Sequence, residues 1–145
     1  MIRFAGLLAA ALLVAGCGGS RSEIPSGEVT ELVTVDVREG EGLLAERGRI
    51  AIVHYTGWLY DPEAPDRRGA KFDSSLDRRQ PYAFELGAGR VIRGWEEGVP
   101  GMRVGGRRLL FIPPELAYGE RGAGNDIPPN STLVFDVELV DIRRP

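Results

Sequence analysis

The sequence has few of the side chains that most catalytic and metal sites use. It contains one cysteine, Cys17, and one histidine, His54. A single cysteine excludes an intramolecular disulfide. A metal ion would have only carboxylates beyond these two residues, and no EF-hand spacing is present. We therefore expect no metal site and no cofactor.

Dense basic clusters are also missing. The formal net charge is −3, and each pair of adjacent arginines lies near acidic residues. Nucleic-acid binding requires many Lys and Arg side chains on phosphates, so no nucleic-acid partner is indicated. The glycine-rich stretches "GAGRVIRG" and "GERGAG" match neither the dinucleotide-binding nor the P-loop pattern, and we interpret both as turns.

The residue types of a nucleophilic triad are present, but no motif joins them. His54, Asp73, Ser74 and Ser75 are the candidates, and there is no Gly-x-Ser-x-Gly elbow. Spacing alone gives no reason for an imidazole to meet a hydroxyl. We therefore expect His54 to be a structural strand residue.

The longest apolar run lies at the N-terminus and is too short to span a bilayer. "MIRFAGLLAAALLVAGC" has one early cation, an apolar stretch and small residues, which is typical of an export signal over residues 1–16. Its last four residues resemble the bacterial lipobox, in which the cysteine, here Cys17, becomes the lipid-modified N-terminus. The Gly/Ser-rich residues 17–28 are expected to form a flexible tether.

This pattern predicts a lipid-anchored protein of the cell envelope. In a cell with two membranes, the residue after Cys17 favours the outer membrane, with the domain facing the periplasm. In a cell with one membrane, the protein would lie on the outer face of the cytoplasmic membrane.

Residues 29–145 have the composition and length of one domain that is rich in turns. Short β-like runs occupy residues 29–37, 49–60, 82–86, 107–112 and 132–142. In the last run, Leu133, Phe135, Val137 and Leu139 alternate with Asp136 and Glu138, which predicts a half-buried antiparallel strand. Residues 59–72 contain two prolines and several charges, and we interpret them as a surface excursion.

One stretch breaks the strand period. Ile92, Trp95, Val99 and Met102 are spaced three, four and three residues apart, which places them on one side of a helix. Because two glycines weaken this helix and Pro100 ends it, the helix must be short and held by packing. Glu96 and Glu97 would then form its solvated back. A short helix on an antiparallel sheet gives an α+β fold.

Several motifs occur together and in order: "VHYTGWL", "KFDSS", "VIRGWEEGVPGMRVGGRR", "PPELAYGERGAG" and "IPPNSTLVFDVELVDI". With these motifs, residues 29–142 resemble the FKBP family of peptidyl-prolyl isomerases. The resemblance implies a twisted, five- to six-stranded antiparallel sheet wrapped around one short helix, with a hydrophobic pocket between them.

Position by position, the resemblance implies two groups of site residues. The catalytic group is Tyr55, Phe72, Asp73, Trp95, Tyr118 and Phe135, and the substrate-binding group is Arg78, Tyr82, Val91, Ile92 and Ile127. Trp95 would form the floor, and the Ile92 backbone N–H and the Tyr118 phenol would donate hydrogen bonds. Asp73 would be a buried carboxylate, and we expect Tyr55 and Arg78 as its partners because an unpaired buried charge is costly.

The implied function is isomerisation of X–Pro bonds in exported proteins as they fold, by a monomer. The ligands would be the polypeptide substrate and, as the resemblance to the FKBP family implies, macrolides. The alternative is a non-catalytic module that holds proline-containing segments or a partner lipoprotein. The sequence departs from the family pattern at Arg90, Ala123 and Asp126, and it has a longer loop near residues 62–68 with no assigned role.

Overall fold

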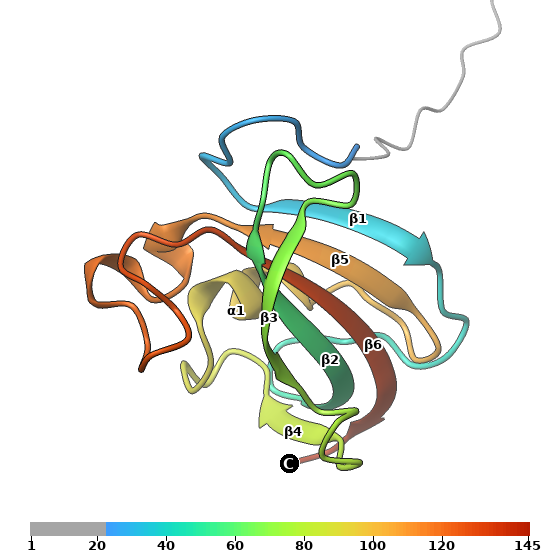
Figure 1. The fold of residues 1–145 in the computed structure, drawn as a ribbon. Helices are drawn as coiled ribbons and strands as arrows, with labels where there is room; N and C mark the ends of the chain where they lie inside the picture. Colours follow the sequence, from blue (N-terminus) through green and yellow to red (C-terminus); the bar gives the residue numbers. More distant parts are fainter. Residues whose placement is uncertain (1–22) are drawn as a thin grey trace, which may run out of the picture.

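A computed structural model describes residues 23–145 (Figure 1). The predicted signal sequence, Cys17 and the first part of the tether lie outside the described residues. The elements, in chain order, are β1 (Val33–Arg38), β2 (Ile50–Tyr60), β3 (Arg68–Ser74), β4 (Tyr82–Glu85), α1 (Arg93–Gly98), β5 (Arg107–Ile112), the 3-10 turns η1 (Pro114–Leu116) and η2 (Gly119–Arg121), and β6 (Leu133–Arg143).

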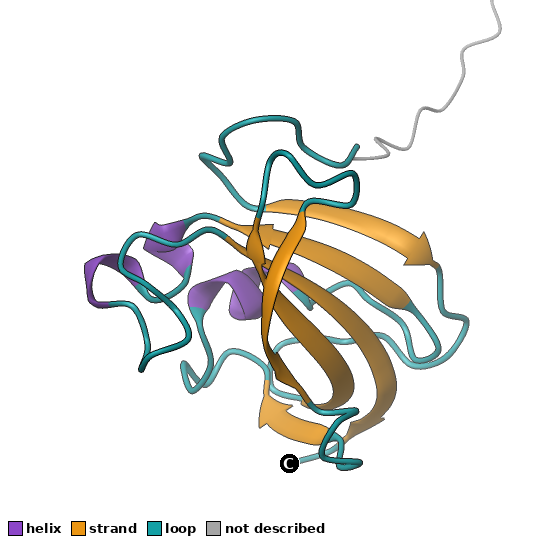
Figure 2. Ribbon diagram, viewed as in Figure 1, coloured by secondary structure: helices purple, strands orange, loops and turns teal. Residues whose placement is uncertain are grey.

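The strands form one six-stranded antiparallel sheet that faces the short helix α1 (Figure 2). The strand order is β1-β5-β6-β2-β3, and β4 also pairs with β2. Ile50–Val53 of β2 pair with β4, whereas the second half of β2 pairs with β3. The predicted fold class is confirmed, and each of the five predicted strand regions contains a strand.

The interpretation of residues 59–72 as a surface excursion was wrong for their second half. Residues 68–74 form β3, which pairs with β2 through Gly57 and Asp73 and through Thr56 and Ser74. This strand has no run of β-branched residues, so its sequence carries no strand pattern of its own. The strand forms because its backbone hydrogen-bonds to β2.

The main core lies between α1 and the face of the sheet that we call the inner face. Trp95, Val99 and Met102 are buried there, as predicted. The predicted helix was too long, however: α1 ends at Gly98, so Met102 lies in the turn after it, and Ile92 precedes it and is half-buried. A β-carbon on Gly94 would lie 2.5 Å from side-chain atoms of Ile112, and one on Gly98 would lie 2.8 Å from Leu110. The two glycines therefore let the helix approach β5 more closely than any other residue type would allow.

The opposite, outer face of the sheet is covered as well. A second buried cluster contains Val29, Leu109, Phe111 and Val134, with Trp58 and Tyr60 packed beside it. Asp136, predicted on a solvated face, is only 8% exposed. The predicted half-buried strand is therefore wrong for the first half of β6, which is buried on both faces.

The N-terminal segment is fixed to the loop between β2 and β3, beside which it lies in Figure 1. The Tyr60 hydroxyl donates to the Gly27 carbonyl at 2.7 Å, and Arg67 Nε donates to the Pro25 carbonyl at 2.8 Å. The last residues of the predicted flexible tether are therefore ordered, and the long loop has a role as their support. Within residues 23–145, no helix is long and apolar enough to cross a membrane.

Candidate functional site

A cavity of about 370 Å³ opens between α1, β2, β3 and the loops that precede α1 and follow η1. It is lined by Tyr55, Phe72, Asp73, Tyr82, Gly89, Arg90, Val91, Ile92, Trp95, Tyr118 and Phe135. Nine of the eleven predicted site residues line this cavity.

Trp95 is the floor of the cavity and organises the aromatic rings around it. Its ring centroid lies 4.9 Å from that of Tyr55 and 5.3 Å from that of Phe135, both nearly perpendicular to it. Edge-to-face contacts of this kind add stability beyond the area that they bury. The indole N–H is buried without an acceptor among the described residues, and aromatic and aliphatic side chains make up most of the lining around it. This site therefore favours apolar groups.

The wall formed by Phe72 and Phe135 depends on a glycine that the sequence reasoning did not assign. The two rings are 5.5 Å apart and perpendicular. A β-carbon on Gly57 would lie 2.6 Å from the Phe72 ring and 2.8 Å from the Phe135 ring. A glycine inside a strand is a recognised signal of such a close approach, and this signal was available in "HYTGWL".

A polar cluster closes one side of the cavity. The Tyr55 hydroxyl donates to Asp73 Oδ2 at 2.5 Å, Arg78 pairs with the other carboxylate oxygen, and Arg78 also donates to the Tyr55 hydroxyl at 2.9 Å. The two expected partners of Asp73 are confirmed. Its side chain is 37% exposed, however, so the carboxylate is only partly buried and not buried as expected.

The cluster fixes the protonation of its members. Partial burial works to raise the Asp73 pKa, but the hydrogen bonds from Tyr55 and Arg78 outweigh it and lower that pKa below 3.8. Burial and the bond to Asp73 raise the Tyr55 pKa above 10.0. At neutral pH, the site therefore holds a carboxylate and a neutral phenol.

Two donors at the cavity have no acceptor in the described part of the chain. Ile92 lies immediately before α1. Its carbonyl accepts hydrogen bonds from the N–H groups of Trp95 and Glu96 in the first turn of the helix, whereas its own N–H has no acceptor within residues 23–145. Tyr118 is 40% exposed, and burial of its hydroxyl, followed by the nearby Asp73 charge, raises its pKa above 10.0. Both groups can therefore donate to a ligand carbonyl at neutral pH.

Two predicted site residues lie elsewhere. Ile127 is buried in the main core, where its backbone pairs with Ala123, and it does not line the cavity. Arg78 acts on the site only through Asp73 and Tyr55. Of the positions that depart from the family pattern, Arg90 lines the cavity, whereas Asp126 is exposed outside it.

Glu96 was expected on the solvated back of α1, and this was wrong. Its carboxylate accepts hydrogen bonds from the backbone N–H groups of Gly87 and Gly89, at 2.5 and 3.1 Å. It thereby holds the loop that carries Arg90, Val91 and Ile92 to the cavity. Glu97 is exposed, as expected, and pairs with Arg93.

His54 and Ser75 do meet, but not as a nucleophile and base. His54 Nδ1 lies 2.9 Å from Ser75 Oγ, and this oxygen also accepts the Tyr55 backbone N–H at 2.8 Å. Ser75 is fully buried, so no substrate reaches it. The contact anchors the turn after β3, and the structural interpretation of His54 is confirmed. No cluster of potential metal ligands occurs within residues 23–145.

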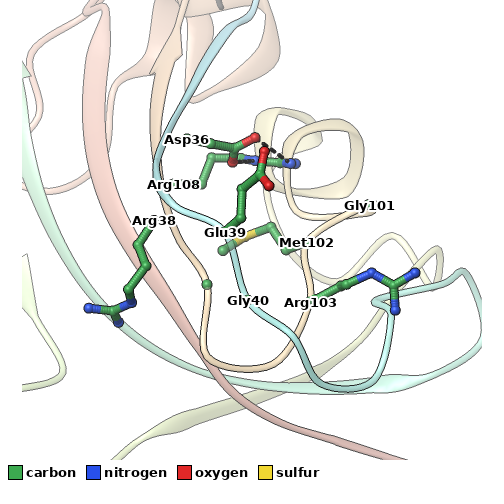
Figure 3. Close-up of a pocket in the computed structure, with 9 residues that line it drawn as sticks. Asp36, Arg38, Glu39, Gly40, Gly101, Met102, Arg103 and Arg108 are labelled. Carbon is green, nitrogen blue, oxygen red and sulfur yellow. Dashed lines mark hydrogen bonds and ion pairs between the residues drawn. The ribbon is translucent and has the colours of Figure 1, made fainter. Parts of the chain in front are cut away.

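A second hollow lies between the end of β1 and the loop before β5, with a volume of about 150 Å³ (Figure 3). Every charged group of its lining except Glu39 is already bonded to another part of the chain. Arg108 donates to both oxygens of Asp36 and to the Gly98 and Pro100 carbonyls, and Arg38 Nε donates to the Gly105 carbonyl. Because these bonds tie loops together, this hollow serves the fold.

Comparisons with known proteins identify the family to which the chain belongs. The family model described as FKBP-type peptidyl-prolyl cis-trans isomerase matches residues 43–140. The chain is similar to the FK506-binding protein of Neisseria meningitidis serogroup A, at 53% identity over 77% of this chain and 95% of that protein. It is also similar to the Saccharomyces cerevisiae peptidyl-prolyl cis-trans isomerase FPR2, at 48% identity over 86% of this chain and 85% of that protein.

Among solved structures, FkpA from Escherichia coli matches with a TM-score of 0.67 and 44% identity. This match covers 78% of the present chain and 48% of FkpA, so the chain spans about half the length of that protein.

Proposed function

Because the chain belongs to the FKBP-type peptidyl-prolyl cis-trans isomerase family, we propose that it accelerates rotation of X–Pro bonds in exported proteins as they fold. The observation that carries this proposal is the cavity floored by Trp95. Its lining is mainly aromatic and aliphatic, and two donors at its edge, the Ile92 N–H and the Tyr118 hydroxyl, have no acceptor within residues 23–145. The polypeptide substrate places its proline ring on the indole.

The chemistry suits such a cavity. Rotation about an X–Pro bond crosses a barrier of about 20 kcal/mol because it destroys amide resonance. At the twisted midpoint the amide has lost its resonance dipole, so it no longer benefits from water as the planar form does. An apolar cavity therefore stabilises the twisted form relative to the planar form.

Placed donors add to this effect. The Ile92 N–H and the Tyr118 hydroxyl hold carbonyls of the substrate on either side of the rotating bond. The hydrogen bonds of the Asp73 cluster hold the Tyr55 ring in its edge-to-face contact with Trp95. Lowering the barrier by about 5–8 kcal/mol gives roughly 10⁴–10⁶-fold acceleration, and no covalent intermediate is required.

The test is protease-coupled turnover of an X–Pro peptide. We expect turnover by the wild-type domain and a large loss in Trp95→Leu. The matched control is Trp58→Leu, which removes the other tryptophan from the outer face and should leave kcat/KM unchanged. Wild-type turnover at the spontaneous rate would contradict the proposal. Peptide binding without turnover would identify a non-catalytic binding module instead.

We further propose that the macrolide FK506 occupies the same cavity, because it gives curated relatives of this chain their name. Trp58→Phe leaves Trp95 as the only tryptophan, so its fluorescence reports on the cavity floor. Saturable quenching by FK506, together with competitive inhibition of turnover, is expected. An unchanged Trp95 signal at saturating macrolide would refute binding at this site.

The lipid anchor at Cys17 and placement in the cell envelope are also proposals, supported by the lipobox pattern of residues 14–17. We expect Cys17→Ser to move the protein from the membrane fraction to the soluble fraction. Unchanged fractionation would show that something other than this cysteine holds the protein at the membrane.

A further inference from the structure

One cation of the cavity has no partner. Arg90 lines the cavity, its side chain is exposed, and no carboxylate within residues 23–145 pairs with it. The other charged group of the lining, Asp73, is neutralised by Arg78. With that pair cancelled, the cavity carries one uncompensated positive charge, and this charge is on Arg90.

The backbone that presents Arg90 is fixed. Glu96 of α1 accepts the N–H groups of Gly87 and Gly89, on the chain immediately before Arg90. Gly89 has a φ of 72°, which favours glycine at this position. Val91 and Ile92 follow directly and are also cavity residues. Arg90 is therefore held beside the residues expected to contact the substrate backbone.

Arg93, a second arginine on the same segment, provides a comparison because it lies away from the cavity and has a carboxylate partner. It lies three residues further on, does not line the cavity, and pairs with Glu97 at 3.1 Å. An arginine that lines an apolar cavity and has no carboxylate partner is available to a carboxylate brought by a ligand.

We propose that Arg90 determines sequence preference, favouring substrates with an acidic side chain directly before or after the proline. This inference rests on the proposed isomerase function and assigns its substrate class. Arg90 is a specificity residue that acts on the side chain next to the rotating bond.

The experiment compares kcat/KM for peptides that differ only by Glu or Gln, placed either before or after the proline. Exposed charge pairs are weak, so we expect an advantage of about two- to fivefold for Glu at one of these positions in the wild type. The advantage should disappear in Arg90→Gln, reverse in Arg90→Glu and persist in Arg90→Lys. It should also shrink at about 1 M salt, where the screening length falls to roughly 3 Å.

Arg93→Gln is the matched control, because it removes the same charge from the same segment away from the cavity. It should leave the Glu-to-Gln ratio unchanged. A wild-type ratio of one at both positions, or a ratio that Arg90→Gln does not alter, would overturn the inference. Either result leaves the isomerase proposal intact, because that proposal fails only when neither peptide is turned over.

Discussion

The two faces of the sheet each hold an aspartate between two partners, and they use it differently. On the outer face, Asp136 is 8% exposed and binds Arg107 with both oxygens, while Arg68 adds a longer contact of 3.4 Å. Arg68 also stacks on Trp58 at 4.3 Å. At the cavity, the side chain of Asp73 is 37% exposed and is held by Tyr55 and Arg78.

The two aspartates differ in how many structural elements their hydrogen-bond networks join. The Asp136 network joins residues of β5, β6, β2 and β3, so its loss would loosen four strands at once. The Asp73 cluster positions one aromatic ring of the cavity. We infer that the outer aspartate maintains the fold and the inner aspartate maintains the site, although their chemistry is alike.

The largest expected effect comes from Asp136→Ala. This change leaves two guanidinium groups without their shared carboxylate. Because Asp136 is buried but the Arg107 side chain is 42% exposed, we expect a loss of about 2–3 kcal/mol, less than for a fully buried pair. Urea unfolding should show that loss in the free energy of unfolding, with kcat/KM of the folded protein unchanged. Glu138→Ala, on the same face and exposed, is the control and should cost less than about 0.5 kcal/mol. Equal losses in the two variants would contradict the assignment.

Gly94→Ala tests the other side of the sheet. The added methyl group meets Ile112, which is fully buried, and overpacking of this kind costs about 1–3 kcal/mol. The better helix propensity of Ala offsets up to about 1 kcal/mol. A net loss of stability and a fall in turnover are expected, because the helix that carries Trp95 must shift. Glu97→Ala is the exposed control, and a Gly94→Ala variant as stable as wild type would refute the close-approach argument.

Asp73→Asn should give the opposite pattern to Asp136→Ala. Because the pair is half-exposed, we expect stability to change by less than about 1 kcal/mol. Turnover should fall by about tenfold, since small displacements of a positioning group cost large factors in rate. Asp77→Asn, which removes only an exposed pair with Lys71, should change neither quantity. A larger loss of stability than of turnover would place Asp73 with the structural aspartate.

The smallest expected effect is that of pH. The lowered pKa of Asp73 means that its contribution to stability is present above about pH 3.9 and is lost as pH falls through the lower folded value. The raised pKa values of Tyr55 and Tyr118 keep both phenols neutral up to at least about pH 10. We therefore expect kcat/KM, measured by NMR exchange, to be flat from about pH 5 to pH 9. A bell-shaped profile would indicate general acid–base chemistry instead.

The position of the helix and most residues of the cavity could be predicted from the sequence. The spacing of Ile92, Trp95 and Val99 predicted the side of the helix that is buried and placed Trp95 correctly, although α1 ends at Gly98 and Met102 lies beyond it. The motif resemblance brought Tyr55, Phe72, Asp73 and Tyr118 to one cavity, although they are far apart in the chain.

What the sequence missed depends on neighbours in space. Strand β3 takes its order from β2, and no local pattern announces that pairing. The burial of Asp136 results from arginines and a tryptophan on three other strands, so its alternation with apolar residues was misleading. Glu96 resembled a solvated residue because its partners are backbone N–H groups, which have no signature in a sequence.

The close contact of Gly94 and Gly98 with β5 has a consequence for how the site is lost. A helix of six residues with two glycines cannot persist alone, because nucleation is unfavourable and propagation too short to compensate. The cavity floor therefore exists only while the sheet does. As the protein unfolds, turnover should therefore be lost no later than the structure of the sheet, and no partly unfolded state should retain the site without the sheet.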